Sequence, residues 1–179
     1  MSVNDQTGAD PRGSSFEEEL YDELEDEGTD RYLTFRLHDE SYGINIAAVT
    51  EIIGLQKITP IPEVPAFIRG VINLRGKIIP IMDVRLRFNL PERPYNDRTC
   101  IIVVGVQDVA VGLAIDEVQE VVRIDPAQID PAPTFVDNSQ HQFINGLGKQ
   151  GDDVKVLLDV ERLIRKDDLQ TLEKVQQAR

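Results

Sequence analysis

The sequence predicts a mainly β protein that contains two similar small barrels, short helices and a C-terminal helix. Two observations lead to this fold class. Short segments rich in Ile and Val are separated by Gly, Pro and Asp, which is the pattern of a barrel or sandwich and not of alternating βα units. In addition, one strand-rich unit of about 70 residues occurs twice.

Strands are predicted where apolar and polar residues alternate with a period of two. In the segment YLTFRLHD, Leu33, Phe35 and Leu37 share one face. HDESYGINI, KIIPIMDV, RTCIIVVGV, VAVGLAID, QEVVRID and DVKVLLDV also read as strands, because they are short, rich in Ile and Val and bounded by Gly, Pro or Asp. Brief helical pieces are expected around residues 47–51, 84–88 and 160–165, and a last helix from near Asp167 to Gln177.

The repeat supports a domain division. FRLHDESYGINIAAVTEII (35–53) aligns with VVGVQDVAVGLAIDEVQEVV (103–122), so that Gly43 corresponds to Gly112 and Glu51 to Glu120. FIRG (67–70) aligns with FING (143–146), and IIPIMDV (78–84) with VKVLLDV (154–160). We therefore expect one barrel near residues 31–96, a second near 97–166, and the last helix in 167–179.

Residues 1–30 form an acidic extension that we predict to be mostly disordered. They hold 11 acids and one base, whereas the rest of the chain has a net charge of only −3. This composition does not offset the entropy of ordering a chain. Phe16, Leu20 and Leu24 recur at a spacing of four, so a transient amphipathic helix is the alternative to a solubilising tail.

Composition excludes several classes of function. A net charge of −13 and the absence of Trp argue against a nucleic-acid-binding groove, which needs clustered cations and exposed aromatic residues. The longest apolar run, residues 100–106, is too short to span a bilayer, and the N-terminus lacks the features of a secretory signal. A single cysteine cannot form an internal disulfide, which fits a reducing compartment.

The sequence offers no catalytic constellation. Cys100 lies in an apolar strand and is expected to be inert, and His38 and His141 lack nearby metal-ligand partners. The segment GVINLRGKI has five residues between Gly70 and Gly76, so it is not a phosphate loop. A β-turn with Arg75 and Gly76 at its tip explains it better. We expect no enzymatic activity, no metal and no cofactor.

The run GINIAAVTEIIGLQKITPIPEVPAFIRGVINLRGKIIPIMDVRLRF, together with VGLAIDEVQEV and FINGLGKQGDDVKVLLDVERL, resembles the CheW family of chemotaxis coupling proteins. The resemblance covers about residues 31–166. It implies two five-stranded SH3-like barrels around a shared core and a non-catalytic adaptor. The implied partners are the regulatory domain of the histidine kinase CheA and the cytoplasmic tip of methyl-accepting chemoreceptors. The implied location is the cytoplasm, at membrane receptor arrays, with no direct membrane insertion.

The resemblance also implies a set of partner-binding residues. The positions that match the family motifs, and Cys100, which stands where the family often has Val, are Val49, Glu51, Gly70, Arg75, Cys100, Gly112, Val118 and Val121. We expect Val49, Gly112, Val118 and Val121 to line a groove that seats a receptor helix. We further expect Glu51 and Arg75 to form an ion pair that sets register. The alternatives are the same adaptor fold in a pilus-type or other chemosensory pathway and a small-ligand-binding β-barrel or enzyme.

Overall fold

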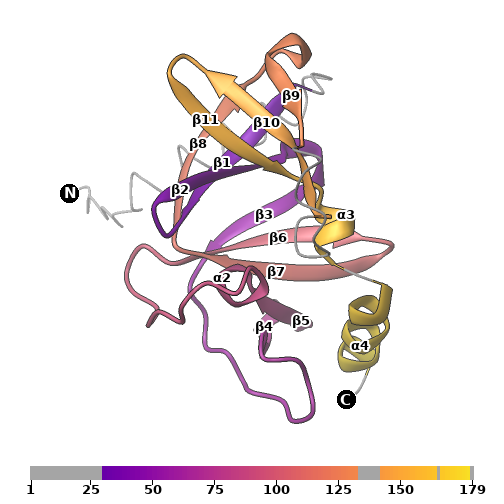
Figure 1. Cartoon of the computed structure of the whole chain (residues 1–179). Coiled ribbons are helices and arrows are strands. Elements are labelled where there is room, and N and C mark those ends of the chain that lie inside the picture. Colours follow the sequence, from indigo (N-terminus) through magenta and orange to yellow (C-terminus); the bar gives the residue numbers. More distant parts are fainter. Residues whose placement is uncertain (1–29, 133–141, 165, 178–179) are drawn as a thin grey trace, which may run out of the picture.

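The chain folds into two curled β-sheets that pack against each other (Figure 1). The computed structural model describes residues 30–132, 142–164 and 166–177, so His141 and all of the acidic extension 1–30 except Asp30 lie outside the described part. The strands are β1 (Arg31–Leu37), β2 (Glu40–Asn45), β3 (Val49–Gly54), β4 (Ile68–Leu74), β5 (Lys77–Asp83), β6 (Cys100–Val106), β7 (Val109–Ile115), β8 (Glu117–Arg123), β9 (Ile129–Pro131), β10 (Ile144–Gln150) and β11 (Asp153–Leu158). The helical elements are η1 (Ile46–Ala48), α2 (Val84–Arg87), η2 (Pro126–Gln128), α3 (Val160–Leu163) and α4 (Lys166–Gln177). The mainly β fold class is confirmed.

Each sheet takes strands from both halves of the chain, which corrects the expected division into barrels at residues 31–96 and 97–166. Sheet A has the order β8-β1-β2-β11-β10-β9, and sheet B has the order β3-β6-β7-β5-β4. Two parallel pairs join the halves, β2 with β11 and β5 with β7. The turn η1 carries the chain from one sheet to the other after β2, so β3 finds its hydrogen-bonding partner, β6, in the second half.

The topology nevertheless bears out the duplication. The strands β1, β2, β3, β4 and β5 correspond in turn to β6, β7, β8, β10 and β11. Exchanging each strand with its counterpart converts the order of sheet A, without β9, into that of sheet B. Local features repeat as well. A register shift precedes Gly70 in β4 and Gly146 in β10, and Asp83 and Asp159 cap α2 and α3. The two copies are therefore related by a pseudo-twofold exchange, and each copy is split between the two sheets.

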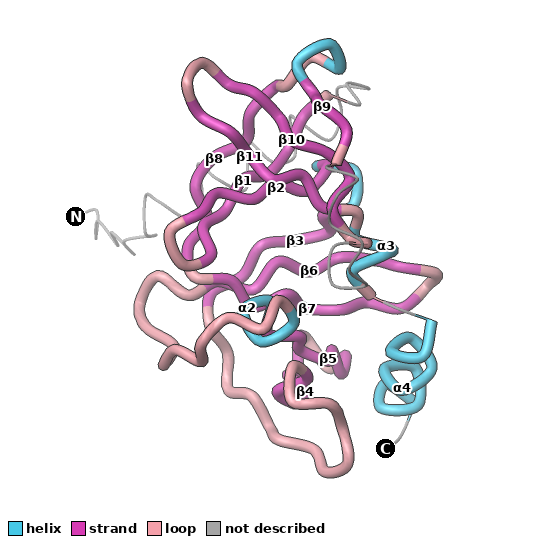
Figure 2. Tube along the Cα trace, in the orientation of Figure 1, coloured by secondary structure: helices cyan, strands magenta, loops and turns pink. Residues whose placement is uncertain are grey.

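Both sheets curl until the two ends of their strand order meet (Figure 2). In sheet A the terminal strands β8 and β9 are consecutive in the chain and are joined by η2. In sheet B, Thr59 follows β3 and forms a bridge with Val71 of β4 through two backbone hydrogen bonds of 2.8 and 2.9 Å. This closure covers strand edges that would otherwise be exposed, as expected for barrels.

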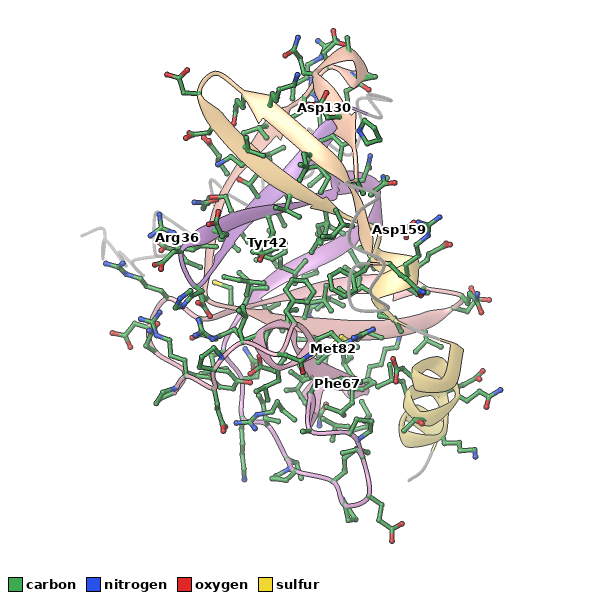
Figure 3. The ribbon with its side chains drawn as sticks, in the orientation of Figure 1. Arg36, Tyr42, Phe67, Met82, Asp130 and Asp159 are labelled. Atoms are coloured by element: carbon green, nitrogen blue, oxygen red, sulfur yellow. The ribbon has the colours of Figure 1, made fainter. Side chains whose placement is uncertain are left out.

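The apolar core has three parts. The largest lies between the two sheets and includes Phe35 and Ile44 from sheet A and Val104 and Leu113 from sheet B, all fully buried. Figure 3 shows Tyr42 on the sheet A side of this region and Met82 on the sheet B side. One smaller cluster belongs to sheet B and another to sheet A; their buried members are Ile72, Ile79, Ile81, Ile101, Val103 and Ala114, and Val122, Ile124 and Leu157.

The short helices were predicted with mixed success. Helical turns at 84–88 and 160–165 and the C-terminal helix are confirmed by α2, α3 and α4. The helical piece expected at 47–51 is wrong beyond Ala48, because β3 begins at Val49 and pairs with β6. Leu172 of α4 is fully buried and joins the core between the sheets, which explains why this helix docks beside β5 and β7.

Candidate functional site

The β4–β5 hairpin presents Arg75 at its tip. Leu74 pairs with Lys77, so Arg75 and Gly76 form a two-residue turn. Both have positive φ, 52° and 85°, which is the geometry of a type I′ turn and the one that follows the twist of the strands. The side chain of Asn73 accepts a hydrogen bond from the Gly76 N–H at 2.8 Å and supports the turn. The predicted turn is therefore confirmed.

Arg75 forms a two-pronged ion pair with Glu51 of β3. Its Nη1 donates to Glu51 Oε2 at 3.1 Å, and its Nη2 donates to Oε1. The strands β3 and β4 lie at opposite ends of the order of sheet B, so this pair crosses the line where the curled sheet closes. The Glu51 side chain is 21% exposed and that of Arg75 is 72% exposed. The expected pairing is confirmed, and the arginine remains accessible from outside.

The four residues expected to line a helix-binding groove differ in burial and do not all reach the surface. Val49 is only 3% exposed and belongs to the core between the sheets. Val118 and Val121 lie on β8, are half-buried and pack against the same core. Each faces a buried residue of β1, because Val118 pairs with Phe35 and Val121 with Leu33. The β8 residues are therefore partly accessible at the surface, whereas Val49 is not.

Gly112 is a buried residue of β7, in the middle of sheet B. It pairs with Ile81 of β5 on one side and with Val103 of β6 on the other. A Cβ at this position would lie 2.5 Å from Ile81 Cδ1 and 2.8 Å from Ile101 Cγ2. Packing inside the sheet therefore requires a glycine at this position, whereas a contact between Gly112 and a partner stays a prediction.

Gly70 is required for a similar reason. Its φ is +139°, and a Cβ would lie 2.1 Å from the carbonyl oxygen of Thr59. The bridge between Thr59 and Val71 depends on this close approach. Gly146 has the equivalent place in the second half, where a Cβ would lie 2.8 Å from the carbonyl oxygen of Asp130. Gly70 thus holds the segment after β3 against β4, which closes sheet B.

Cys100 begins β6 and packs half-buried against the core between the sheets. Burial raises the pKa of its thiol above the ordinary value of 9.0. A raised pKa keeps the thiol protonated near neutral pH, and the thiolate is the reactive form. This environment agrees with an inert cysteine that replaces an apolar residue.

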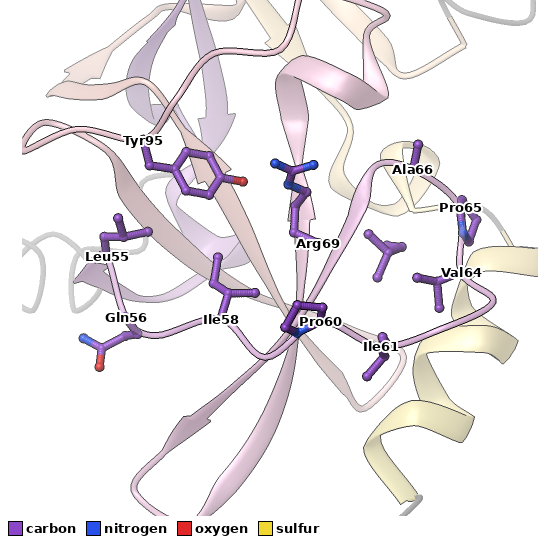
Figure 4. Close-up of a pocket in the computed structure, with 11 residues that line it drawn as sticks. Leu55, Gln56, Ile58, Pro60, Ile61, Val64, Pro65, Ala66, Arg69 and Tyr95 are labelled. Carbon is purple, nitrogen blue, oxygen red and sulfur yellow. The ribbon is translucent and has the colours of Figure 1, made fainter.

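An open hollow of about 510 Å³ lies between β4 and the 55–67 segment (Figure 4). Most of its lining is apolar, including Leu55, Ile58 and Ile61, and Arg69 stands near its centre. Arg69 pairs with Glu92 at 2.5 Å and faces the ring of Tyr95 at 6.0 Å. Arg69 lies near the start of β4, whereas Arg75 lies in the turn that follows its other end.

Sequence reasoning missed an ion pair that ties the two sheets together. Asp116, between β7 and β8, accepts a hydrogen bond from the backbone N–H of His38 at 2.9 Å and one from Arg85 at 2.5 Å. His38 lies in the β1–β2 turn of sheet A, and Arg85 lies in α2, directly after β5 of sheet B. The side chains of Arg85 and Asp116 are only 7% and 13% exposed. No local signal marks this pair, because its members are far apart in the chain.

Within the described residues, no group of three or more His, Cys, Asp or Glu side chains is placed to hold a metal ion. None of the helices in this part of the chain is both long enough and apolar enough to cross a membrane.

Two closed sheets around a shared core, with an accessible ion pair and an apolar hollow on the outside, define a small two-barrel β domain. A family model for the CheW-like domain matches residues 31–168. The chain therefore belongs to the CheW family.

Similar proteins support this assignment. The chain is 37% identical over 144 residues to the chemotaxis protein CheW of Klebsiella aerogenes, covering 80% of this chain and 87% of that protein. It is 32% identical over 142 residues to the chemotaxis protein CheW of Bacillus subtilis, covering 79% and 91%. The crystal structure of the scaffolding protein TtCheW from Thermoanaerobacter tengcongensis matches with a TM-score of 0.71 and 36% identity, covering 79% of this chain and 96% of that chain. Protein FrzA of Myxococcus xanthus is 27% identical over 135 residues, covering 75% of this chain and 84% of that protein.

Proposed function

We propose that this chain is a non-catalytic adaptor of chemotaxis signalling that couples methyl-accepting chemoreceptors to the histidine kinase CheA. The observation that carries the proposal is the match to the CheW-like domain over residues 31–168, together with the likeness to a CheW scaffolding protein. The proposed partners are the regulatory domain of CheA and the cytoplasmic tip of the receptors. The proposed location is the cytoplasm, with recruitment to receptor arrays at the membrane.

Arg75 is the residue we propose as the main partner contact. Its side chain is 72% exposed, and Glu51 holds it in one orientation at the closure of sheet B. A guanidinium held in place by a carboxylate loses less conformational entropy on binding than a free arginine. Glu51 then acts through Arg75, and the half-buried Val118 and Val121 on β8 supply apolar contact at the edge of sheet A.

The remaining candidate residues support binding indirectly. Val49 and Gly112 are buried, Gly70 closes sheet B, and Cys100 packs against the core between the sheets. We propose that substitutions at these positions alter partner binding by changing the shape of the barrels. Signal transfer then consists of a different affinity for two receptor states, because the proposed role includes no energy-consuming step.

A pull-down tests the proposal. The full chain is mixed with the CheA regulatory domain and, separately, with a receptor tip fragment. We expect both to bind the wild type and Arg75→Ala to weaken at least one of them. Arg36→Ala is the matched control, because Arg36 is an exposed arginine on β1 of the other sheet. If the wild type binds neither partner, the proposal fails.

The similarity to FrzA favours a second candidate, the same adaptor fold in another chemosensory pathway. The same pull-down separates the two. Binding to a kinase and receptor of a different chemosensory system, with none to the chemotaxis pair, supports this second candidate.

A further inference from the structure

The hollow beside β4 combines an apolar lining with one central cation. Among the described residues, only Leu55 and Val154 are large hydrophobic residues that are exposed, and Leu55, 42% exposed, lies in the lining of the hollow. Arg69 stands between the apolar side chains (Figure 4). Its carboxylate partner, Glu92, is 60% exposed, so another carboxylate can replace it with little loss of energy. These features suit an apolar segment that carries acidic residues along its edge.

The chain contains a segment of this composition, FEEELYDEL (16–24), which lies outside the described residues. Phe16, Leu20 and Leu24 are spaced by four, so they share one face of a helix, with acids between them. A hollow that accepts apolar anchors at spacing i and i+4 is a common way to bind such a helix. The segment and the hollow are therefore complementary in both apolarity and charge.

The connection to the body does not favour binding within one molecule. Five residues, 25–29, separate Leu24 from Asp30, and an extended chain spans at most about 3.3–3.6 Å per residue. The Asp30 carbonyl, directly before β1, accepts a hydrogen bond from the backbone N–H of Ile124, directly after β8 of sheet A. The hollow lies beside β4, and Figure 1 shows the 55–67 segment at the end of sheet B that is remote from sheet A. Residues 25–29 are therefore too few to carry the segment 16–24 from sheet A, past the core between the sheets, to the hollow of the same molecule.

We propose that the hollow binds residues 16–24 of a second copy of this chain. The contact is heterologous, because the segment of one molecule occupies the hollow of the next, so it can continue into a chain of molecules. Phe16, Leu20 and Leu24 face Leu55, Ile58 and Ile61, and an acid of the segment pairs with Arg69 in place of Glu92. The inference concerns this chain alone and does not depend on the proposed chemotaxis partners.

Sedimentation velocity of the full chain over a concentration series tests this. For a contact of three apolar side chains and one ion pair, we expect a dissociation constant of roughly tens to hundreds of micromolar. Leu20→Asp and Leu55→Asp should each weaken the association by about tenfold or more, because each buries a charge against apolar groups. The matched controls are Thr7→Asp, which adds the same charge to the extension outside residues 16–24, and Val154→Asp, at the other exposed large hydrophobic residue of the described part; both should associate like the wild type.

Mixing the two impaired variants gives the sharpest outcome. The Leu20→Asp variant keeps an intact hollow, and the Leu55→Asp variant keeps an intact segment 16–24. The segment of the second variant can therefore bind the hollow of the first. The remaining hollow and segment of such a pair are both impaired, so an equimolar mixture should form dimers and no larger species. Circular dichroism and urea unfolding verify that both variants are folded. The proposal is overturned if the wild type stays monomeric over the series, if the controls impair association equally, or if the mixture forms no dimers.

Discussion

Arg87 donates a hydrogen bond from Nε to the backbone carbonyl of Leu163 at 3.1 Å, and Leu163 occupies the position equivalent to Arg87 in the other copy of the repeat. The guanidinium of Arg87 also lies 5.3 Å from the ring of Phe67 and 5.5 Å from that of Phe143, which are themselves equivalent residues. Arg87 is 8% exposed. This arginine therefore sits where the two copies of the repeat meet and contacts both.

Replacing Arg87 should destabilise the whole protein. We expect Arg87→Ala to lower the free energy of unfolding by about 2–4 kcal/mol, because it removes two cation–π contacts, leaves the Leu163 carbonyl without this donor and creates a cavity. Urea unfolding followed by circular dichroism measures the change. Arg162→Ala, at an exposed arginine of α3, is the control and should change it by less than about 0.5 kcal/mol. A similar loss in both variants would contradict the assigned role.

The Glu51–Arg75 pair should matter more for binding than for stability. Either Glu51→Arg or Arg75→Glu should lower the free energy of unfolding by no more than about 1 kcal/mol, because the pair is partly exposed. Each single reversal should weaken partner binding, because the orientation of residue 75 is lost. The double reversal should restore the pair and recover part of the binding energy in a double-mutant cycle. A double variant no better than the singles would show that the pair does not set the binding geometry.

Gly112 should tolerate a side chain poorly. We expect Gly112→Ala to lower the free energy of unfolding by about 1–3 kcal/mol, because the new Cβ overlaps Ile81 Cδ1 and Ile101 Cγ2. Adding Ile81→Val removes the nearest obstructing atom and should recover part of the loss. If Gly112→Ala leaves urea unfolding unchanged but weakens partner binding, the glycine contacts the partner directly and the packing explanation is wrong.

Tyr95 should make stability depend on pH in the alkaline range. Burial, and then its hydrogen bond of 2.8 Å to Asp83, raise the pKa of Tyr95 above its ordinary value of 10.0. Because the folded state holds this proton more tightly than the unfolded chain, the stabilisation is complete below about pH 10 and declines as the pH rises further. The free energy of unfolding should therefore fall above that pH, and it should fall less steeply in Tyr95→Phe. Equal slopes for the two proteins would contradict the role of this hydroxyl.

Much of this protein follows from local sequence. Alternation of apolar and polar residues predicts β1, and short runs rich in Ile and Val predict β5 and β6. The positive φ of Gly76 follows from the need for a tight turn between two strands. The Glu51–Arg75 pair was also expected, because the two side chains have opposite charge and come close if their segments pack together. The sequence did not predict how exposed the candidate residues are, and Val49 and Gly112 are buried. A valine or glycine in a strand has the same local pattern whether its face meets solvent, a partner or the other sheet.

The sequence by itself determined the strand-rich composition, the duplication, the hairpin turn and membership of the CheW family, because each depends on residue spacing or on local backbone preference. Tertiary structure decided how the two copies share their strands between sheets A and B, and which side chains lie between the sheets. It also brought Asp116 to Arg85 and Arg87 to Leu163. Strand pairing and burial are set by the packing of segments distant in the chain, and the energy of those contacts is not encoded at any single position.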